Sequence, residues 1–429
     1  MKNRIEKLFI CIISLAIITS FSLGSLSMGG ISTNVDNFSL SVSSLSTQDI
    51  FWPPNSGKWT EVAPETQGLN SSKIAEMFEY IEDNSYDVHS VIIVRNGYLL
   101  TEEYFWESQI YINPNGFKSY PWDLFHEQTS ATKSFMSTLI GIALQEGYLD
   151  NINQTLYEFF AHIWSPSFPN STLKQNITIE QLLTHNSGLV AEGPLYPAGG
   201  NLGTRIDMIK WALDLPLIFT PGQAGAFHYS SDGPNLLSGI ITNLTGKSTE
   251  EFAQEYLFEP LGISEDEYNW LHDNNNISYG GYFFQCSPQV QAKLGILYLN
   301  NGTWNGTQIV DKDFLKEATT DQTGYSCGYL WWTDGPYESY NAAGFGGQVI
   351  YVIPKYDMTV AFTAGAIDND PNYDTMLSDY ILHQITDPPE ENPIPEDQAI
   401  PGYDFGMLFL IIFCASAVLI NRRKKTSKN

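Results

Sequence analysis

The sequence predicts a mixed α/β fold of the α+β type, in which both ends of the chain contribute strands to one sheet and a helical subdomain is inserted between them. Residues 88–105 have the pattern of two strands joined at Asn96-Gly97, and residues 348–364 have the pattern of a second strand pair. Between them, from about 130 to 270, apolar residues recur mainly at helical spacing. Strands at both ends with helices in the middle favour a sheet closed by the two ends of the domain.

The first expected elements are a helix and a hairpin. A helix beginning near Ser72 would have an apolar face formed by Ile74, Met77, Phe78 and Ile81. The following strands are expected at Val88–Val94 and Tyr98–Phe105. They flank Asn-Gly, the dipeptide that two-residue hairpin turns favour because both turn residues need positive φ.

Five helices are expected in the middle of the chain. Ser130 opens the first, an apolar helix that Gly147 ends. The other four are expected at Ile179–Thr184, Thr204–Leu213, Asn235–Leu244 and Glu250–Tyr256. Gly246 ends one of these helices, and Ser248 with Glu251 forms a capping box for the next.

The C-terminal part returns to strands. Gln348–Ile353 and Met358–Ala364 are predicted to pair around Pro354-Lys355-Tyr356-Asp357, and a last helix is expected from about Thr375 to Ile385.

The folded domain is expected to lie between two targeting segments. Residues 1–28 have a basic start and an apolar run without a clear cleavage site, which is typical of a signal peptide or a signal anchor. After a flexible leader at 29–60 comes the folded domain at 61–385, then a stalk rich in proline and acidic residues at 386–404. Residues 405–421 are a C-terminal transmembrane anchor in this interpretation, followed by a cytoplasmic basic tail at 422–429.

The predicted anchor is short but has the right flank. Its apolar run Phe405–Ile420 has 16 residues, fewer than the about 20 that usually span a bilayer. The Arg-Arg-Lys-Lys cluster that follows favours a stop-transfer anchor with its tail inside the cell. Both chain ends therefore place the folded domain at the cell surface, outside the cytoplasm.

The net charge, the cysteines and the glycosylation triplets give further information about the class of protein. With 21 basic and 48 acidic residues, the chain has a net charge of −27, which disfavours nucleic-acid binding. Cys286 and Cys327 fit either a disulfide or two isolated buried thiols. Glycosylation is permitted at nine N-x-S/T triplets, which begin at Asn37, Asn70, Asn153, Asn170, Asn176, Asn243, Asn276, Asn301 and Asn305.

The strongest chemical signal is the pair Ser130 and Lys133. Residues three apart on a helix share one face, so the lysine amine can reach the serine hydroxyl and help to remove its proton. An S-x-x-K pair facing a cleft is typical of covalent acyl transfer. The alternative is that Ser130 caps a core helix and Lys133 is solvated. A second match, Ser171-Thr172-Leu173-Lys174, lies in a turn-rich stretch and is interpreted as a decoy.

Two further segments supply the rest of an acyl-transfer site. Tyr229 lies in a loop just before a helix, and a nearby lysine ammonium would lower its pKa so that it can carry protons. The segment Gly344-Phe345-Gly346-Gly347-Gln348 is expected to begin a strand with little side chain, which would let substrate lie against backbone and expose an N–H group to an oxyanion. Taken singly, Tyr229 fits a core aromatic and the glycines fit a plain turn.

Five segments occur together in one order: Ser130-x-x-Lys133, Leu182-Leu183-Thr184-His185-Asn186-Ser187-Gly188-Leu189, Tyr229-Ser230-Ser231, Gly328-Tyr329-Leu330-Trp331-Trp332 and Gly344-x-Gly346-Gly347-Gln348. This ordered set resembles the penicillin-recognising serine hydrolase family, in the branch of class C β-lactamases, related esterases and short-amide hydrolases. The resemblance covers about residues 61–385. It implies an antiparallel sheet and a helical subdomain with the site between them.

The resemblance also implies roles for individual residues. Ser130 would be the nucleophile, Lys133 its activator and Tyr229 the general base and acid. The backbone N–H groups of Ser130 and Gln348 would form the oxyanion hole.

Two positions depart from the family pattern. Ser231 replaces the usual amide side chain of the Y-x-N motif, and its hydroxyl can still bond Lys133. Phe345 stands where a lysine or histidine is common, so a substrate carboxylate would lose a charge-assisted bond worth roughly 1.5–3 kcal/mol. An ester or short amide with a neutral or apolar acyl group fits better, with Trp331, Trp332 and Phe345 lining the pocket.

The sequence therefore predicts an extracytoplasmic serine hydrolase that cleaves an ester or short amide through an acyl-Ser130 intermediate. The alternatives are a β-lactamase or D-amino-acid peptidase, and a catalytically silent ligand-binding relative. No cofactor and no metal are expected. The singly placed histidines His126, His162, His185 and His228 lack metal-ligand spacing, and His185 is expected to be structural.

Overall fold

The computed structural model describes residues 52–54, 59–105, 111–112, 118–119, 125–190, 207–366, 369–383 and 385. They belong to one compact unit, residues 50–429, and only that unit is described below. The predicted segments 1–28, 386–404, 405–421 and 422–429 lie outside the described residues, as do Asn37 and most of the leader 29–60. Within the described ranges, no helix is both long and apolar enough to cross a bilayer.

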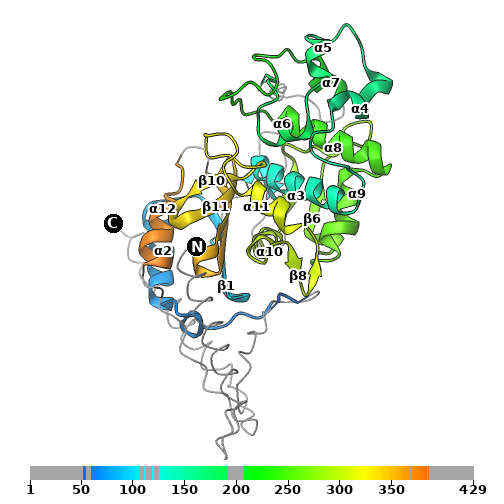
Figure 1. The fold of residues 1–429 in the computed structure, drawn as a ribbon. Helices are drawn as coiled ribbons and strands as arrows, with labels where there is room; N and C mark the ends of the chain where they lie inside the picture. The colour runs from blue at the N-terminus through cyan, green and yellow to red at the C-terminus, as the bar shows by residue number, and fades with distance from the viewer. Residues whose placement is uncertain are drawn as a thin grey trace, which may run out of the picture. The chain divides into compact units, whose positions relative to one another are not determined.

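The central element is a six-stranded sheet in which each neighbouring pair of strands is antiparallel. The strand order is β10-β11-β12-β13-β1-β2, so β13 from the end of the domain pairs directly with β1 from its start (Figure 1). The prediction that both chain ends form one sheet is confirmed. The strands are β1 (Val88–Arg95), β2 (Tyr98–Tyr104), β10 (Trp332–Gly335), β11 (Ser339–Gly344), β12 (Gln348–Ile353) and β13 (Met358–Ala364).

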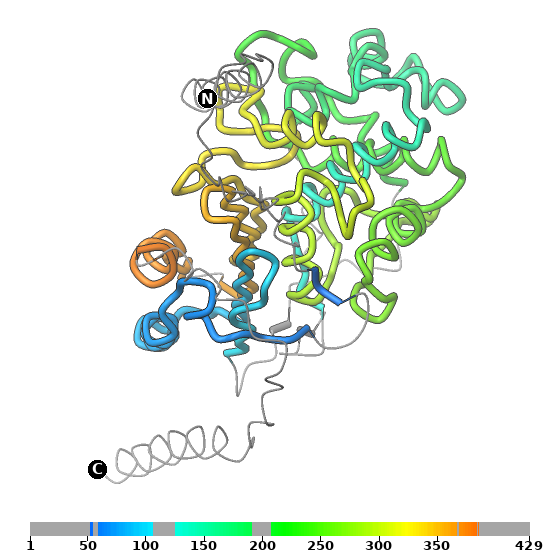
Figure 2. The backbone as a smooth tube through the Cα atoms, turned by 60° about the horizontal axis from the view of Figure 1, so that its bottom comes forward, coloured from blue at the N-terminus to red at the C-terminus, as the bar shows by residue number. Residues whose placement is uncertain are grey.

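One face of the sheet is covered by helices from the two ends of the domain. These are α2 (Ser71–Asp83), α12 (Tyr373–Thr375) and the π-helical η8 (Met376–Leu382). Figure 2 shows the first helix in blue beside the last in orange. Ile74, Met77 and Ile81 of α2 are buried in the cluster that also holds Met376 and Leu377, so burial of apolar surface joins the chain ends. The side chain of Asn70 caps α2, which begins at Ser71, one residue ahead of the predicted start.

The other face of the sheet is covered by α10 (Pro288–Leu299) and α3 (Thr132–Gln145). Helix α10 packs on β1, β12 and β13. Gly295 allows this close approach, because an added Cβ would lie 2.1 Å from Thr359 Oγ1. Helix α10 was not predicted from the sequence.

The helical subdomain occupies the upper right of Figure 1. Its helices are α4 (Leu156–Phe160), α5 (Ser171–Lys174), α6 (Ile179–Leu183), α7 (Met208–Asp214), α8 (Asp232–Thr245) and α9 (Thr249–Ala253), with the π-helical η4 (Gln254–Phe258) continuing α9. The capping box of Ser248 and Glu251 and the left-handed Gly246 at the end of α8 are both confirmed. Helix α8 packs against α3, α6 and α7, which ties the subdomain to the Ser130 helix.

The remaining elements are short. A three-stranded sheet is ordered β5-β7-β6, from β5 (His126–Glu127), β6 (Tyr268–Trp270) and β7 (Phe284–Cys286). Two-stranded pairs are formed by β3 (Tyr111–Ile112) with β4 (Lys118–Ser119), and by β8 (Thr303–Trp304) with β9 (Thr307–Gln308). The rest are α11 (Lys312–Ala318) and the 3₁₀ turns η1 (Pro64–Gln67), η2 (Thr129–Ala131), η3 (Ala161–Ile163), η5 (Glu265–Glu267), η6 (Pro336–Glu338) and η7 (Pro354–Tyr356).

The prediction for the glycine-rich segment was right about the strand that begins at Gln348 and wrong about Gly344. Gly344 ends β11 instead of beginning a strand, residues 345–347 form the turn, and Gln348 begins β12. Gly346 and Gly347 have φ of 83° and 88°, a left-handed conformation that glycine adopts without the strain of a Cβ. Periodicity alone did not show that the short β11, which carries little apolar pattern, precedes this turn.

Candidate active site

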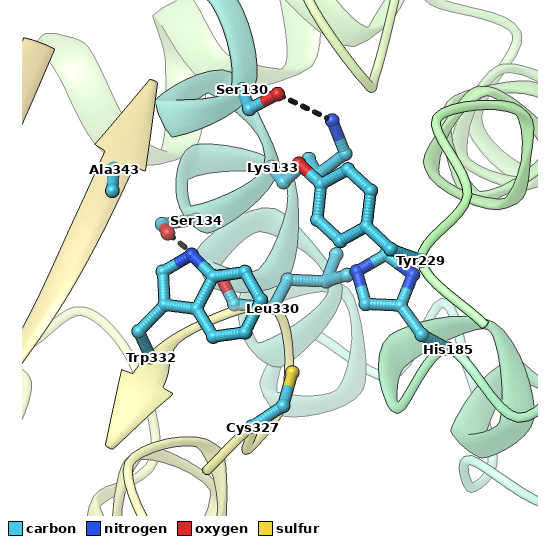
Figure 3. Close-up of a pocket in the computed structure, with 9 residues that line it drawn as sticks. All are labelled: Ser130, Lys133, Ser134, His185, Tyr229, Cys327, Leu330, Trp332 and Ala343. Carbon is cyan, nitrogen blue, oxygen red and sulfur yellow. Dashed lines mark hydrogen bonds between the residues drawn. The ribbon is translucent and has the colours of Figure 1, made fainter. Parts of the chain in front are cut away.

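Ser130 lies in a 3₁₀ turn directly before the helix that carries Lys133. The turn η2 spans Thr129–Ala131, and α3 starts at Thr132, so the expected helix opens with a tighter first turn. Thr129 has a φ of 45°, which is uncommon for a residue with a branched Cβ. Ser130 is partly exposed and lines a pocket between α3, β11 and the subdomain (Figure 3).

Lys133 is buried, and its amine has three oxygen partners. Nζ lies 3.1 Å from Ser130 Oγ, 3.2 Å from Ser231 Oγ and 2.8 Å from the carbonyl oxygen of Gly281. Burial lowers the pKa of Lys133 to about 7, and the negative charge of Asp232 opposes part of that shift. The lysine is therefore not solvated, and a substantial fraction of it is neutral near pH 7.

Asp232 is a buried carboxyl beside this lysine. It follows Ser231 at the start of α8, with 1% of its surface exposed. Burial raises the pKa of Asp232 to about 6, while Asn235 and the charge of Lys133 lower it. Asn235 Oδ1 also accepts the N–H of Gly281, whose carbonyl binds Lys133. Asp232 was not predicted from the sequence, although it stands next to the predicted motif residue Ser231.

Tyr229 faces Ser130 and Lys133 from the loop ahead of α8 (Figure 3). Its ring stacks on Trp332 at a centroid distance of 6.0 Å and contacts His185 at 4.6 Å. The Lys133 amine lies 4.8 Å from the ring centroid. Burial raises the pKa of Tyr229 to about 12, which Ser130 only partly offsets. The expectation of a lowered tyrosine pKa was wrong, because desolvation of the buried ring outweighs the hydrogen bond with Ser130.

His185 belongs to the pocket and not only to a structural turn. It has a φ of 54°, its ring packs on Tyr229, and its Nδ1 accepts the N–H of Ser230. Burial lowers the pKa of His185 to about 3, with a further contribution from Lys133, so the imidazole is neutral at physiological pH. His185 thus holds the Tyr229-Ser230-Ser231 segment in place, as a buried and uncharged support.

The turn after β11 lies against the residues before Ser130. Thr129 Oγ1 donates to the carbonyl oxygen of Phe345 at 3.0 Å, and a Cβ on Gly344 would come within 2.2 Å of the Gln128 carbonyl oxygen. Phe345 is 64% exposed. Gln348 begins the next strand, and its side chain bonds the carbonyl oxygens of Ala364 and Gly346. The part of the segment closest to Thr129 is therefore Gly344-Phe345.

Of the three predicted aromatic lining residues, one lines the pocket. Trp332 is a lining residue, together with Ser134, Cys327, Leu330 and Ala343, which were not predicted to line the pocket. Trp331 was wrongly predicted: it is fully buried, and its Nε1 donates to Tyr298 Oη. Neighbouring residues of an extended segment point to opposite sides, and here the second tryptophan faces the site.

The other sequence candidates lie away from this chemistry. In the second S-x-x-K match, Ser171 Oγ accepts from Trp164 Nε1 and Lys174 Nζ donates to the Leu213 carbonyl oxygen, so the pair does not act together. Cys286 and Cys327 are both free and buried, which excludes a disulfide between them in this structure. Over the described ranges, no group of three or more His, Cys, Asp or Glu side chains is arranged to hold a metal ion.

The family model described as Beta-lactamase matches residues 79–276. The 6-aminohexanoate-dimer hydrolase of Paenarthrobacter ureafaciens is 22% identical over 283 residues, covering 61% of this chain and 71% of that protein. Residues 79–276 are thus a β-lactamase-family domain. The chain is a serine hydrolase of this β-lactamase-related kind, whose members act on amide or ester bonds.

Two further similarities agree with this assignment. A putative D-alanyl-D-alanine carboxypeptidase of Escherichia coli K12 is 26% identical over 238 residues, covering 49% of this chain and 51% of that protein. The crystal structure of a family VIII carboxylesterase has the same fold, with a TM-score of 0.57 and 16% identity, covering 76% of this chain and 98% of that one. The hydrolase thus spans about half the length of one of these curated relatives and most of another's.

Proposed function

We propose that this hydrolase cleaves an ester or short amide through an acyl intermediate on Ser130. The observation that carries the proposal is the position of the Lys133 amine, buried and 3.1 Å from Ser130 Oγ. A neutral amine at this place donates to Gly281 and Ser231 and keeps its lone pair for the serine hydroxyl proton. It can therefore act as the base that a serine nucleophile needs.

In the acylation step, Ser130 Oγ attacks the substrate carbonyl carbon and its proton passes to Lys133 Nζ. The negative charge that forms on the carbonyl oxygen is stabilised by backbone N–H groups, that of Ser130 and one from the Gly344–Gln348 turn. Gln348 is the donor that the sequence predicted, and this assignment stays a prediction. Because the turn lies against Thr129, both donors belong to one rigid arrangement.

Tyr229 completes the proton path. With its pKa raised to about 12, Tyr229 is a protonated phenol at neutral pH and donates its proton to the leaving oxygen or nitrogen. The Lys133 ammonium then returns a proton to the tyrosinate. In deacylation, water attacks the acyl carbonyl carbon, gives its proton to the same Lys133–Tyr229 pair, and Ser130 recovers its hydroxyl hydrogen.

The proposed substrate has a neutral or apolar acyl group. Phe345 is exposed at the turn beside Thr129, where a cation would suit a substrate carboxylate, and Trp332 and Leu330 line the pocket. The alternative is a β-lactamase or a D-amino-acid peptidase, and the similarity to a putative carboxypeptidase supports this alternative. A silent ligand-binding relative is a weaker alternative, because it has no chemical need for a desolvated lysine at the serine.

The direct test is hydrolysis of p-nitrophenyl butyrate by the wild-type protein and by Ser130→Ala. The substitution is expected to reduce kcat/KM by roughly 10³-fold or more, because the nucleophile is lost while binding remains. Equal activity of both proteins would refute the role of Ser130. An inactive wild type that also fails to react with a fluorophosphonate would favour the binding-protein alternative.

We further propose that the catalytic domain lies at the cell surface, held by the C-terminal segment 405–421. The support is the sequence pattern alone: an apolar run followed by four basic residues, and an apolar N-terminal segment with a basic start. All eight N-x-S/T asparagines within the described residues are exposed, which keeps glycosylation sterically open.

A further inference from the structure

Glu127 is a buried carboxyl three residues before Ser130 that the proposed mechanism does not use. It belongs to β5, with 9% of its surface exposed. Its Oε1 accepts two backbone N–H groups, from Phe283 at 2.7 Å and from Thr129 at 3.3 Å, and Oε2 lies 3.4 Å from Gln285 Nε2. A single carboxylate oxygen therefore joins two segments that are more than 150 residues apart in the sequence.

The two residues whose backbone N–H groups bond Glu127 have an unusual backbone conformation. Thr129 has a φ of 45° and Phe283 a φ of 67°, in the left-handed region that residues with a Cβ rarely occupy. Such conformations are energetically unfavourable and persist only where the surroundings enforce them. Hydrogen bonds from both N–H groups to one buried oxygen are an enforcing interaction of this kind.

Each strained residue adjoins a different part of the active site. Thr129 precedes Ser130 directly and donates its hydroxyl to the Phe345 carbonyl oxygen in the turn. Phe283 lies two residues after Gly281, whose carbonyl oxygen accepts from Lys133. A shift of either segment would change the distance between the serine, the lysine and the turn.

We propose that Glu127 is a positioning residue that sets the Ser130–Lys133 geometry by holding the N–H groups of Thr129 and Phe283 on its Oε1 atom. This rests on the proposed acyl-Ser130 function. Glu127 touches neither substrate nor the reacting atoms, and its effect passes through the two backbone segments.

In this proposal the length of the Glu127 side chain matters for activity, and its charge does not. Burial raises the pKa of Glu127 to about 7, although the N–H groups that it accepts oppose the shift, so it is partly protonated at neutral pH. Either form presents Oε1 as an acceptor, and so does the glutamine of Glu127→Gln. Glu127→Asp keeps the acid but shortens the reach by one methylene, so it cannot hold both N–H groups in place.

The test compares Glu127→Gln, Glu127→Asp and wild type in the full-length protein. The measurements are the rate of Ser130 labelling by a fluorophosphonate, kcat and KM for p-nitrophenyl butyrate, and the melting temperature. Glu127→Gln is expected to stay within about 3-fold of wild type. Glu127→Asp is expected to lose about 10²-fold in labelling rate and kcat with little change in KM, as a displacement near 1 Å can do.

A matched control is the pair Asp273→Asn and Asp273→Glu. Asp273 is also a buried carboxylate that accepts backbone N–H groups, from Met208, Asn275 and Ile277. Its length change should lower the melting temperature without slowing the labelling of Ser130, which shows what a purely structural role looks like.

The outcomes distinguish the two proposals. Slow labelling in Glu127→Asp with near-normal labelling in Glu127→Gln supports the positioning role. Equal labelling in all three proteins, or a loss in Glu127→Gln as large as in Glu127→Asp, overturns it. A wild type that is not labelled at Ser130 refutes the acyl-enzyme proposal, and the role of Glu127 falls with it.

Discussion

At Lys133, burial and a neighbouring carboxylate act in opposite directions on the amine's affinity for a proton. Desolvation lowers its pKa to about 7, and the charge of Asp232 raises it. Since the proposed base is the neutral amine, kcat/KM should rise with pH through the pKa of Lys133 and fall below it. The groups that face this amine are Ser130, Tyr229, Ser231 and Asp232, with neutral His185 behind Tyr229.

We predict that Asp232→Asn moves the acid limb of the pH–rate profile to lower pH. Removing the negative charge makes the Lys133 ammonium less stable, so its pKa falls and the neutral base persists at lower pH. The profile of kcat/KM for p-nitrophenyl butyrate between pH 5 and 9 measures this. Asp313→Asn, at an exposed site on α11, is the charge control and should not move the midpoint. A shift to higher pH in Asp232→Asn would contradict the account.

The serine and lysine were predictable as residues, but their electrostatics were not. Motif spacing placed Ser130 and Lys133 on one face of a helix, and the structure brings them together with Tyr229 and Ser231. The sign of the tyrosine pKa shift depends on how completely the ring is buried by Trp332 and His185, and sequence spacing carries no measure of that burial.

Among the elements of the site, the turn between β11 and β12 is held by contacts on two sides. It runs from Gly344 to Gln348, pairs those two residues across the hairpin, and contacts η2 through Thr129. Gly347 has a φ of 88°, and a Cβ there would lie 2.8 Å from Tyr373 Oη and 2.9 Å from Ala364 Cβ. Tyr373 Oη also donates to the Gly347 carbonyl oxygen, so the turn is fixed from the opposite side.

We predict that Gly347→Ala lowers both stability and activity. The alanine would have to adopt a left-handed conformation, which costs about 1–2 kcal/mol, and would also displace Tyr373 or Ala364. A displaced turn should reduce kcat about 10²-fold. Gly306→Ala is the matched control, since Gly306 has a φ of 81° but open space around its Cβ position. It should lose stability only. Equal activity losses in both variants would show that the turn geometry is not needed.

A substitution in the same turn is predicted to change the substrate preference. Phe345→Lys would place a cation on the exposed position beside Thr129, and a charge-assisted bond of roughly 1.5–3 kcal/mol corresponds to about 10- to 100-fold in kcat/KM for a substrate with a carboxylate. We expect slow nitrocefin turnover by wild type and a gain of this size in Phe345→Lys, with Phe345→Leu unchanged. Efficient nitrocefin turnover by the wild type would contradict the proposed neutral acyl group.

The two buried strands near the end of the domain were predicted well from their short apolar runs and the turn between them, and the buried helix α10 was not predicted. The strands at 348–353 and 358–364 match β12 and β13 residue for residue. Helix α10 was missed because it is buried almost throughout: Gln291, Lys293 and Gly295 lie inside as well as its leucines, which leaves no polar face to reveal a period.

At the scale of the whole domain, the position of the site follows from the sheet, because strands from both ends of the domain pair in it. Strand β13 pairs with β1 inside the sheet. The residues between these two strands in the sequence form the helical subdomain with Tyr229 and the helix α3, which Ser130 directly precedes. The order of motifs along the chain was enough to predict this architecture. The loop geometry around the pocket was not predictable, because residues such as Thr129, His185, Phe283 and Leu330 adopt positive φ without being glycine.

Also at this scale, we predict that the full-length protein is found in the membrane fraction when expressed with its N-terminal segment. A chain that ends at Ile385 should move to the soluble extracytoplasmic fraction, because it lacks the apolar run and the basic tail. Fractionation of cells followed by protease treatment from outside measures both location and orientation. Full protection of the domain from external protease would contradict the proposed orientation.

The central claim is the acyl intermediate on Ser130, and peptide mass spectrometry after fluorophosphonate labelling tests it most directly. The account predicts a single modified site, the Ser130 hydroxyl, with labelling that slows below pH 7 as Lys133 becomes protonated and vanishes in Ser130→Ala. An adduct on any other residue, or equal labelling of Ser130→Ala, would contradict it.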